Sequence, residues 1–354
     1  MIITILAAFF SLIGLMVIHE FGHFVLAKKF GVKVEEFGVG YPPRIFGIKK
    51  GETIYSLNLI PFGAFVKVYG EQGGIEDYHS FSGKSMWQRF AIVLGGVVSF
   101  WIVAIIILSV VAGAWGLPTE VDDSQNVSNP KVHIAVIIAD SPAKTAGLMA
   151  GDIVVGFEKI SELQGFIGSN KGKEITLTVK RGEDLLEKKI IPRVAPPEGE
   201  GPLGIGLARS GLMTYPWYEA PLRGVLATYD LTANVIAGWV MGLKGIMGIS
   251  KIPDGLKVEF MGPLGIFDLL REYFKMGINY FLFLVALLST ALALANILPI
   301  PALDGGKMVF LAIEAIRRKP INHKLEQRIS SVFFALLIIM MIFVTVKFDI
   351  PRVF

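Results

Sequence analysis

IITILAAFFSLIGLMVIHEFGHFVLA, residues 2–27, is apolar at nearly every position and is followed at once by Lys28 and Lys29. At about 1.5 Å per residue, a helix of this length crosses the hydrocarbon core of a bilayer, which is about 30 Å thick. The run lacks a positive leading region and exceeds signal-peptide length, so we expect a retained span. Because positive residues favour the cytoplasmic side, this helix should run from outside to inside.

Ionisable residues interrupt this apolar run as His19-Glu20-Phe21-Gly22-His23. Helix positions four apart share a face, so His19 and His23 can bind one Zn²⁺ while Glu20 acts as a base toward water. Ionisable groups inside a span are costly and usually functional, which favours a metal site over a chance occurrence of the pattern. The chain has no cysteine, so His and carboxylate must supply the ligands. Catalytic zinc sites usually take three protein ligands, and the sequence must provide a third.

The composition predicts a polytopic α-helical membrane protein with a water-soluble insert. The 354 residues are 53% hydrophobic and 18% charged, and the mean hydropathy is +0.59. These values are wrong for a purely soluble protein. The net charge of +4 is modest, and its basic residues cluster in particular loops. That pattern indicates membrane topology and argues against a nucleic-acid partner.

About four segments are expected to cross the bilayer, and they divide the chain into four parts. The spans are 2–27, 90–115, 280–300 and 329–346. Basic residues flank their inner ends, so both termini should lie outside. The expected parts are an N-terminal membrane core at 1–118, an extracytoplasmic insert at 119–210, an amphipathic interfacial helix with a turn or re-entrant segment at 211–275, and a C-terminal membrane core at 276–354. Within 211–275, the turn or re-entrant segment is expected at 261–266.

Residues 30–85 are too polar and glycine-rich to span, and 34–40 and 54–69 are expected to be short strands. Two interpretations remain open for this membrane-associated β-hairpin region. It lies on the membrane surface, or it dips toward the metal and holds an extended peptide along its edge by strand addition. The apolar side chains of Phe62 and Phe65 favour the second interpretation.

The insert alternates charged and apolar residues and is punctuated by Pro and Gly. Strands are expected at 132–138, 153–157, 175–180 and 185–191. Ser141-Pro142-Ala143, Ala146-Gly147-Leu148 and Gly151-Asp152 resemble the pattern of a bacterial-type PDZ domain. This resemblance implies a β-rich domain that binds peptide ends, and the alternative is a spacer without a ligand.

The third ligand is expected where the third span ends. The segment Asn296-Ile-Leu-Pro299-Ile-Pro301-Ala-Leu-Asp304-Gly-Gly breaks the helix at two prolines. Asp304 is the only carboxylate between Tyr280 and Gly306, and the basic residues that follow place it on the cytoplasmic side, like the His pair. Alone it would be an ordinary Asp-Gly turn. Beside a two-His site that lacks a ligand, it is the candidate.

Together, the His-Glu-x-x-His span, the PDZ-like insert and the late Asn-x-x-Pro-x-Pro-x-Leu-Asp-Gly segment resemble the site-2 protease family. The similar subgroup is the bacterial regulator-of-sigma-factor intramembrane zinc proteases with a single PDZ domain. The resemblance implies that His19, His23 and Asp304 bind zinc and that Glu20 is catalytic. It also implies substrate contacts from Asn296, Pro299, Pro301, Gly38, Gly40, Phe62, Gly63 and Phe65.

The activity implied is hydrolysis of peptide bonds within or near the transmembrane segments of single-span membrane proteins. Anti-sigma factors and remnant signal peptides are the expected substrates, cleaved as the second step of regulated intramembrane proteolysis. The implied location is the bacterial inner membrane, with the active site near the cytoplasmic face.

Two other functions remain open. A catalytically inactive PDZ-bearing scaffold would not need His19, Glu20 or Asp304. A metal transporter would need further intramembrane ionisable residues, and the second and fourth spans offer none.

Overall fold

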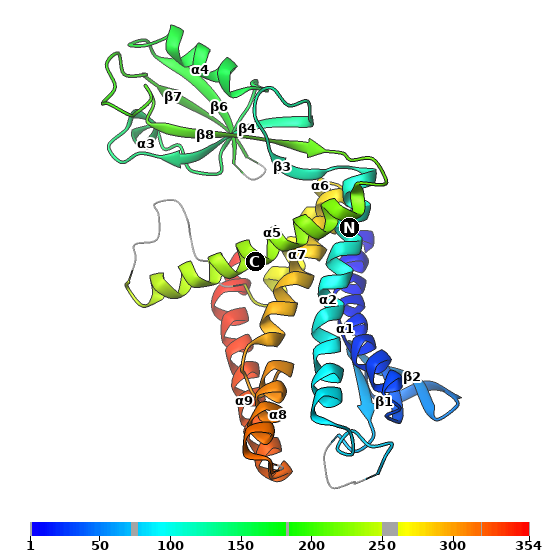
Figure 1. Cartoon of the computed structure of the whole chain (residues 1–354). Coiled ribbons are helices and arrows are strands. Elements are labelled where there is room, and N and C mark those ends of the chain that lie inside the picture. Colours follow the sequence, from blue (N-terminus) through cyan, green and yellow to red (C-terminus); the bar gives the residue numbers. More distant parts are fainter. Residues whose placement is uncertain (1, 72–76, 182–183, 250–260, 320, 354) are drawn as a thin grey trace. The chain divides into compact units, whose positions relative to one another are not determined.

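The computed structural model describes residues 2–71, 77–181, 184–249, 261–319 and 321–353 (Figure 1). The chain divides into two compact units, and each is described by itself. The first is built from Met1–Val110, Pro221–Ile236 and Phe260–Phe354, so its helices come from both ends of the sequence. The second contains Val111–Ala220 together with Ala237–Glu259.

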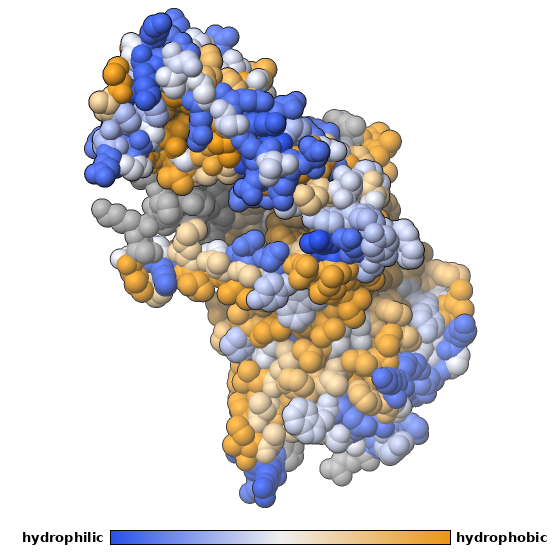
Figure 2. Space-filling model, turned by 45° about the horizontal axis from the view of Figure 1, so that its top comes forward, coloured by the Kyte–Doolittle hydropathy of each residue, from blue (hydrophilic) through white to orange (hydrophobic). Residues whose placement is uncertain are grey.

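Four helices of the described residues are long and apolar enough to cross a membrane, as the hydropathy predicted. The surface over the helices of the first unit is largely hydrophobic, whereas that of the second unit is largely hydrophilic (Figure 2). The helices are α1 (Ile2–Lys29), α2 (Met86–Ala114), α7 (Ile278–Ile297) and α9 (His323–Val344), the last continued by a π-helical turn, η1 (Thr345–Asp349), and by α10 (Ile350–Val353). The predicted spans are therefore confirmed, with ends that differ by a few residues.

The core of the first unit lies where α1, α2 and α7 meet α6 (Pro263–Met276). Leu15 of α1, Val97 of α2 and Leu284 of α7 are almost completely buried there, and Leu270 of α6 is fully buried. The hydroxyl of Ser289 on α7 donates to the backbone carbonyl of Phe100 on α2 at 2.7 Å. Such a hydrogen bond satisfies a buried polar group at a helix–helix contact.

The expectation of a turn or re-entrant segment at 261–266 is wrong from Pro263 onward, because α6 begins there. Proline is favoured at the first position of a helix, and Ile266, Phe267 and Leu270 recur at helical spacing on the buried face. The amphipathic helix expected before it is α5 (Ala220–Ile246). Residues 250–260 of the predicted 211–275 part lie outside the described residues.

The β-hairpin region consists of β1 (Val34–Lys50) and β2 (Thr53–Val68), longer than the short strands expected. The hairpin folds over itself, so that 34–39 pairs on one side with 54–57 and on the other with 64–68. Among the residues that the structure describes, 64–68 pairs with no strand other than 34–39, so it is an edge of the hairpin. The outward side of an edge can bond other groups.

Helix α8 (Asp304–Arg317) was not predicted, and Asp304 is its first residue. Glycines follow at once, and they let the start of α8 pack against the preceding loop. A Cβ on Gly305 would lie 2.1 Å from the carbonyl oxygen of Leu298, a distance that real Cβ atoms do not show. The Asp-Gly-Gly sequence therefore fixes how the helix leaves the Pro299–Pro301 turn.

The second unit contains an antiparallel sheet in the order β3-β8-β4-β5-β6-β7. Two helices accompany it, α3 (Pro142–Thr145) and α4 (Ile160–Ser169), and their apolar faces join the buried core. Strands β3 and β8 and helix α4 were not predicted. The strands are Leu117–Glu120 (β3), Ser128–Ile137 (β4), Ile153–Val154 (β5), Ile175–Arg181 (β6), Asp184–Ile190 (β7) and Ile205–Met213 (β8).

The turn at Gly151-Asp152, before β5 of the insert, is held by an ion pair. Arg181 donates to both oxygens of Asp152, at 2.7 and 2.8 Å, and Asp152 is almost completely buried. The same carboxylate accepts from the backbone N–H of Met149 at 2.9 Å. A two-point Arg–carboxylate pair of this kind fixes the turn before β5.

Candidate metal centre

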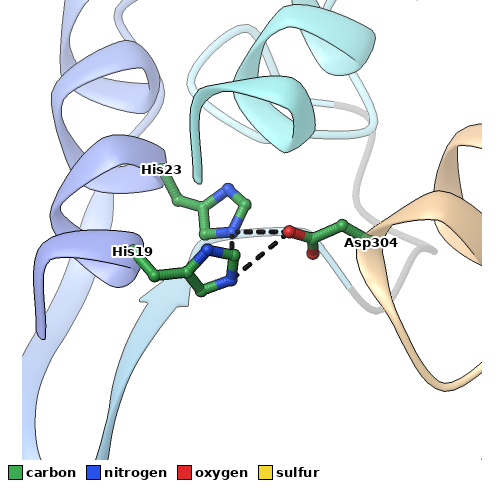
Figure 3. A group of neighbouring side chains, drawn as sticks. All are labelled: His19, His23 and Asp304. Atoms are coloured by element: carbon green, nitrogen blue, oxygen red, sulfur yellow. Dashed lines mark hydrogen bonds and ion pairs between the residues drawn. The ribbon is translucent and has the colours of Figure 1, made fainter. Parts of the chain in front are cut away.

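His19, His23 and Asp304 meet in the first unit, although Asp304 comes from the opposite end of the chain (Figure 3). The Oδ2 atom of Asp304 lies 3.3 Å from the Nε2 atoms of both His19 and His23. The two Nε2 atoms are themselves 3.3 Å apart. All three side chains are largely buried, with 12–18% of their surface exposed. This is the group of possible metal ligands that the described residues contain.

The spacing of these three atoms fits one tetrahedral Zn²⁺. Ligand atoms about 2.0–2.2 Å from a tetrahedral zinc are roughly 3.3–3.6 Å from one another. All three pairs of atoms have a separation of 3.3 Å. The arrangement also leaves a fourth position for water or a substrate oxygen, as catalytic zinc sites do.

Hydrogen bonding gives a second, independent argument for a cation. Nδ1 of His23 lies 2.9 Å from the carbonyl oxygen of Ile92, which can only accept, so Nδ1 carries the proton. The Nε2 atom of neutral His23 then presents a lone pair. Oδ2 of Asp304 is buried and accepts no hydrogen bond from the described residues. Two facing acceptors repel each other unless a proton or a metal ion lies between them, and two imidazoles with one carboxylate are a ligand set suited to a metal ion.

The contact between α1 and α2 fixes the two imidazoles. The ring of His19 stacks on Phe100 of α2, with ring centroids 4.8 Å apart and an interplanar angle of 17°. His23 lies against Gly96, where a Cβ would come within 2.2 Å of Nε2. Glycine at 96 is therefore required by the close approach of the His23 ring.

Glu20 lies beside the imidazoles and is held by the β-hairpin region. The backbone N–H of Val66 donates to Oε2 of Glu20 at 3.0 Å. Val66 also faces Phe37 within the hairpin, so this N–H points outward from the edge segment 64–68. Glu20, the metal group and the edge segment share one cavity of about 250 Å³. Its walls include His19, Glu20, His23, Tyr41, Ala64, Phe65, Val66, Glu71, Asp304 and Lys307.

Of the hairpin residues predicted to contact the substrate, one lines the metal cavity and three glycines pack behind its wall. Phe65 lines the cavity and stacks on Tyr41, with centroids 6.2 Å apart. Gly38 makes room for the Phe65 ring, and Gly63 makes room for Tyr41. Gly40, with φ +77°, lies against the carbonyl oxygen of Ile60. These glycines shape the wall of the cavity without lining it.

The other predicted contact residues lie outside the metal cavity. Phe62 is exposed, and its edge packs on Phe9 of α1 with centroids 5.9 Å apart. The amide of Asn296 donates to the carbonyl of Leu292 at 2.9 Å, within its own helix. Pro299 is exposed. Pro301 lines a neighbouring hollow of about 370 Å³, which shares Asp304 with the metal cavity.

Sequence reasoning missed two charged residues in the cavity wall, Glu71 and Lys307. Lys307 counted only as one of the basic residues that mark the cytoplasmic side. Its spacing of three from Asp304 was a usable signal, since residues three apart share a helix face. Glu71 follows β2 and carries no motif of its own.

The chain is similar to known proteins over nearly its whole length. The model of the family described as "Peptidase family M50" matches residues 7–340. A protein of Clostridium perfringens is 33% identical over 350 residues, which are 97% of each chain. The zinc metalloprotease RasP of Oceanobacillus iheyensis is 27% identical, over 99% of this chain and 100% of that protein. The regulator of sigma-W protease RasP of Bacillus subtilis is also 27% identical, over 100% of both.

Proposed function

The chain belongs to peptidase family M50, the site-2 protease family, and is an intramembrane zinc metalloprotease; from this premise we propose that His19, His23 and Asp304 hold its zinc ion and that Glu20 is its general base. The observation that carries this assignment is the meeting of the three ligand atoms at 3.3 Å from one another. Zinc bound there supplies Lewis acidity toward a peptide carbonyl and lowers the pKa of a coordinated water.

Glu20 performs the proton transfers. Its carboxylate takes a proton from the attacking water and delivers it to the amine that leaves, a role for which Asp and Glu are suited. The Val66 N–H donates to Oε2 of Glu20 at 3.0 Å and orients the carboxylate. Its other oxygen, Oε1, does not take part in this hydrogen bond and can accept the proton of the water. The wall of the cavity thus positions the base before substrate arrives.

The edge segment 64–68 holds the substrate in an extended form. A helix hides its carbonyl groups in its own hydrogen bonds, so a transmembrane substrate must be unwound before hydrolysis. Strand addition to this edge provides replacement hydrogen bonds for the unwound segment, from backbone groups other than the Val66 N–H that Glu20 accepts. Support comes from the single strand neighbour of 64–68 and from the presence of Ala64, Phe65 and Val66 in the metal cavity.

The remaining predicted contacts assist this edge. Gly38, Gly40 and Gly63 maintain the hairpin's shape, while Phe62 packs against Phe9 of α1. Asn296, Pro299 and Pro301 form the segment that leads into Asp304, and we assign them contact with the substrate once it is bound.

The substrates are single-span membrane proteins. The Bacillus subtilis relative is named a regulator of a sigma factor's activity, which for this chain suggests anti-sigma factors trimmed outside the membrane, and remnant signal peptides, as substrates of a second cleavage. We infer from Lys28 and Lys29 in the last turn of α1, and from Arg317 in the last turn of α8, that the metal centre lies near the cytoplasmic face of a bacterial inner membrane. Both termini and the second unit are then extracytoplasmic.

The insert at 119–210 is a PDZ domain that binds peptide ends. The proposal is supported by the antiparallel sheet with α3 and α4 and by the Ser141 hydroxyl, which caps α3 by accepting from Lys144. In this role the domain selects substrates that have already been trimmed.

Zinc content and cleavage, measured together, test the assignment. Purified chain in liposomes should hold one zinc and cleave a single-span substrate, and Asp304→Ala should lose both properties. Asp268→Ala is the matched control, because Asp268 pairs with Arg271 on α6 and does not line the cavity. If Asp304→Ala retains zinc, Asp304 is not a ligand. If cells that carry Asp304→Ala show unchanged function of the protein, a non-catalytic scaffold is favoured.

A further inference from the structure

One face of α8 carries the candidate zinc ligand, two apolar side chains and two charged side chains. Asp304, Lys307, Met308, Leu311 and Glu314 follow a spacing of three, four, seven and ten residues from the first. These offsets lie along a single helical stripe. Met308 and Leu311 pack into an apolar cluster with residues of α1, α2 and the hairpin. A charged residue stands on either side of this apolar contact.

The first charged residue, Lys307, is one turn beyond Asp304 and forms an ion pair with Glu71. Its ammonium group also lies 5.1 Å from the centre of the Phe81 ring. Glu71 and Lys307 both line the metal cavity and the neighbouring hollow at Pro301, so the pair stands between the two. The ion pair thus ties the segment after β2 directly to the helix of the ligand.

The second charged residue, Glu314, is about 10 Å further along the helix axis than Lys307 and about 15 Å from Asp304. Its carboxylate lies 2.9 Å from Nη1 of Arg89 on α2, and only 6% of the Glu314 side chain is exposed. It also accepts from the backbone N–H of Ile321 at 3.0 Å. This pair secures the far end of the same stripe and provides an internal comparison for the first.

The position of α8 decides where the carboxylate of Asp304 lies, because the aspartate side chain is short. A slip of one residue moves a helical side chain by about 1.5 Å along the axis and about 100° around it. Zinc ligands tolerate only a few tenths of an ångström. An attachment one turn from Asp304 therefore controls whether its Oδ2 reaches the two imidazoles.

We propose that Glu71 is a positioning residue for the metal centre: through its ion pair with Lys307 it fixes the register of α8 and so places Asp304 against His19 and His23. This inference rests on the proposed ligand set. It extends the site to a residue of the hairpin region that is not one of the proposed zinc ligands.

The test measures zinc affinity and site geometry of the full-length chain in detergent. Zinc dissociation constants come from competition with a chromogenic chelator, and Co²⁺ substitution reports a tetrahedral site through its visible absorption. Loss of residues that orient metal ligands typically costs 10–100-fold in metal affinity. We expect Glu71→Gln and Lys307→Met to weaken zinc binding by about 10–100-fold and to reduce the Co²⁺ bands. Lys307→Arg keeps a cation for Glu71, so its zinc affinity and Co²⁺ bands should be close to those of the wild type.

Two control variants separate positioning from general stability. Glu314→Gln removes a buried carboxylate from the same stripe, and it should lower thermal stability while changing zinc affinity less than Glu71→Gln does. Glu52 lies in the hairpin region and is the exposed partner of Lys28. Glu52→Gln should therefore change neither zinc affinity nor thermal stability. Equal losses of zinc affinity in Glu71→Gln and Glu314→Gln would overturn the proposal in favour of a purely structural role.

A double variant and a ligand variant complete the test. Glu71→Gln with Lys307→Met removes both charges and should still bind zinc weakly, because the attachment is gone. Wild-type affinity in the double variant would also overturn the proposal. Asp304→Ala, measured in parallel, distinguishes the two failures: if it keeps zinc, the ligand set is wrong, and if it alone loses zinc, only the role of Glu71 is wrong.

Discussion

The imidazole of His23 is fixed by the backbone of Ile92, since its protonated Nδ1 donates to the Ile92 carbonyl oxygen at 2.9 Å. This hydrogen bond settles which ring nitrogen faces Asp304. It is the outer contact that metal-binding histidines usually make, and it keeps Nε2 basic and correctly aimed. The second helix thus contributes to the metal centre without supplying a ligand.

Glu20→Gln should slow hydrolysis strongly and leave zinc in place. Glutamine still accepts the Val66 N–H through its amide oxygen, but it cannot take a proton from water. General-base catalysis typically contributes about 10²–10⁴-fold, so cleavage of a transmembrane substrate should fall by that factor. Zinc stoichiometry by elemental analysis should equal that of wild type. Cleavage at more than a tenth of the wild-type rate would show that another group acts as the base.

Gly96→Ala should weaken zinc binding, because the new methyl group would lie 2.2 Å from Nε2 of His23. The ring must move, and disturbed ligand orientation costs about 10–100-fold in affinity. Chelator competition measures the change. The control is Gly14→Ala in α1, where a Cβ meets nothing within 4 Å. Equal zinc affinity in both variants would mean that the α1–α2 contact relaxes without disturbing the site.

Deletion of residues 128–208 should relax substrate selection without slowing the chemistry. The deletion removes most of the second unit and leaves the metal cavity intact, because the residues that line it belong to the first unit. Full-length and trimmed versions of one substrate, compared in the same liposomes, measure selectivity. We expect the deletion variant to cleave both, and a persistent preference for the trimmed form would assign selection to another part of the chain.

The start of α4 should loosen in acid. Asp123 accepts from the backbone N–H groups of Ser161 and Ile160, each at 2.8 Å, and these hydrogen bonds lower the pKa of the Asp123 carboxyl. The folded pKa is therefore below the unfolded value of about 3.9. The stabilisation is complete above that value and is lost as the pH falls through the folded pKa. Amide exchange at Ile160 and Ser161, compared with Asp123→Asn, should differ at neutral pH and converge in acid. Identical exchange at pH 7 would contradict the role of Asp123.

Much of the membrane fold followed from the sequence because its signals are long. A run such as Ile2–Lys29 must satisfy its backbone internally, so its hydropathy alone predicts a helix. The pairing of His19 with His23 follows from helical spacing, and their meeting with Asp304 was anticipated from charge on one side of the membrane. These inferences depend on the periodicity and composition of the sequence, which can be read without knowledge of the tertiary structure.

Other features depend on contacts between distant segments, which no local pattern reports. Glu71 matters only because Lys307 lies beside it, and β8 is read as a strand only once it pairs with β4. The segment after Met261 was misjudged since Gly-Pro-Leu-Gly is typical of a turn, whereas Pro263 starts a helix whose apolar side is buried. Tertiary burial overrode the local preference there.

The metal group joins residues near the beginning of the chain to one near its end. While the protein is being synthesised, the first span and its two imidazoles enter the membrane long before the codon for Asp304 is read. A partly made chain then holds an incomplete set of ligands and no helix α8 to present the last one. With the proposed ligand set, peptidase activity requires α8 to have left the ribosome and to have presented Asp304 to the two imidazoles.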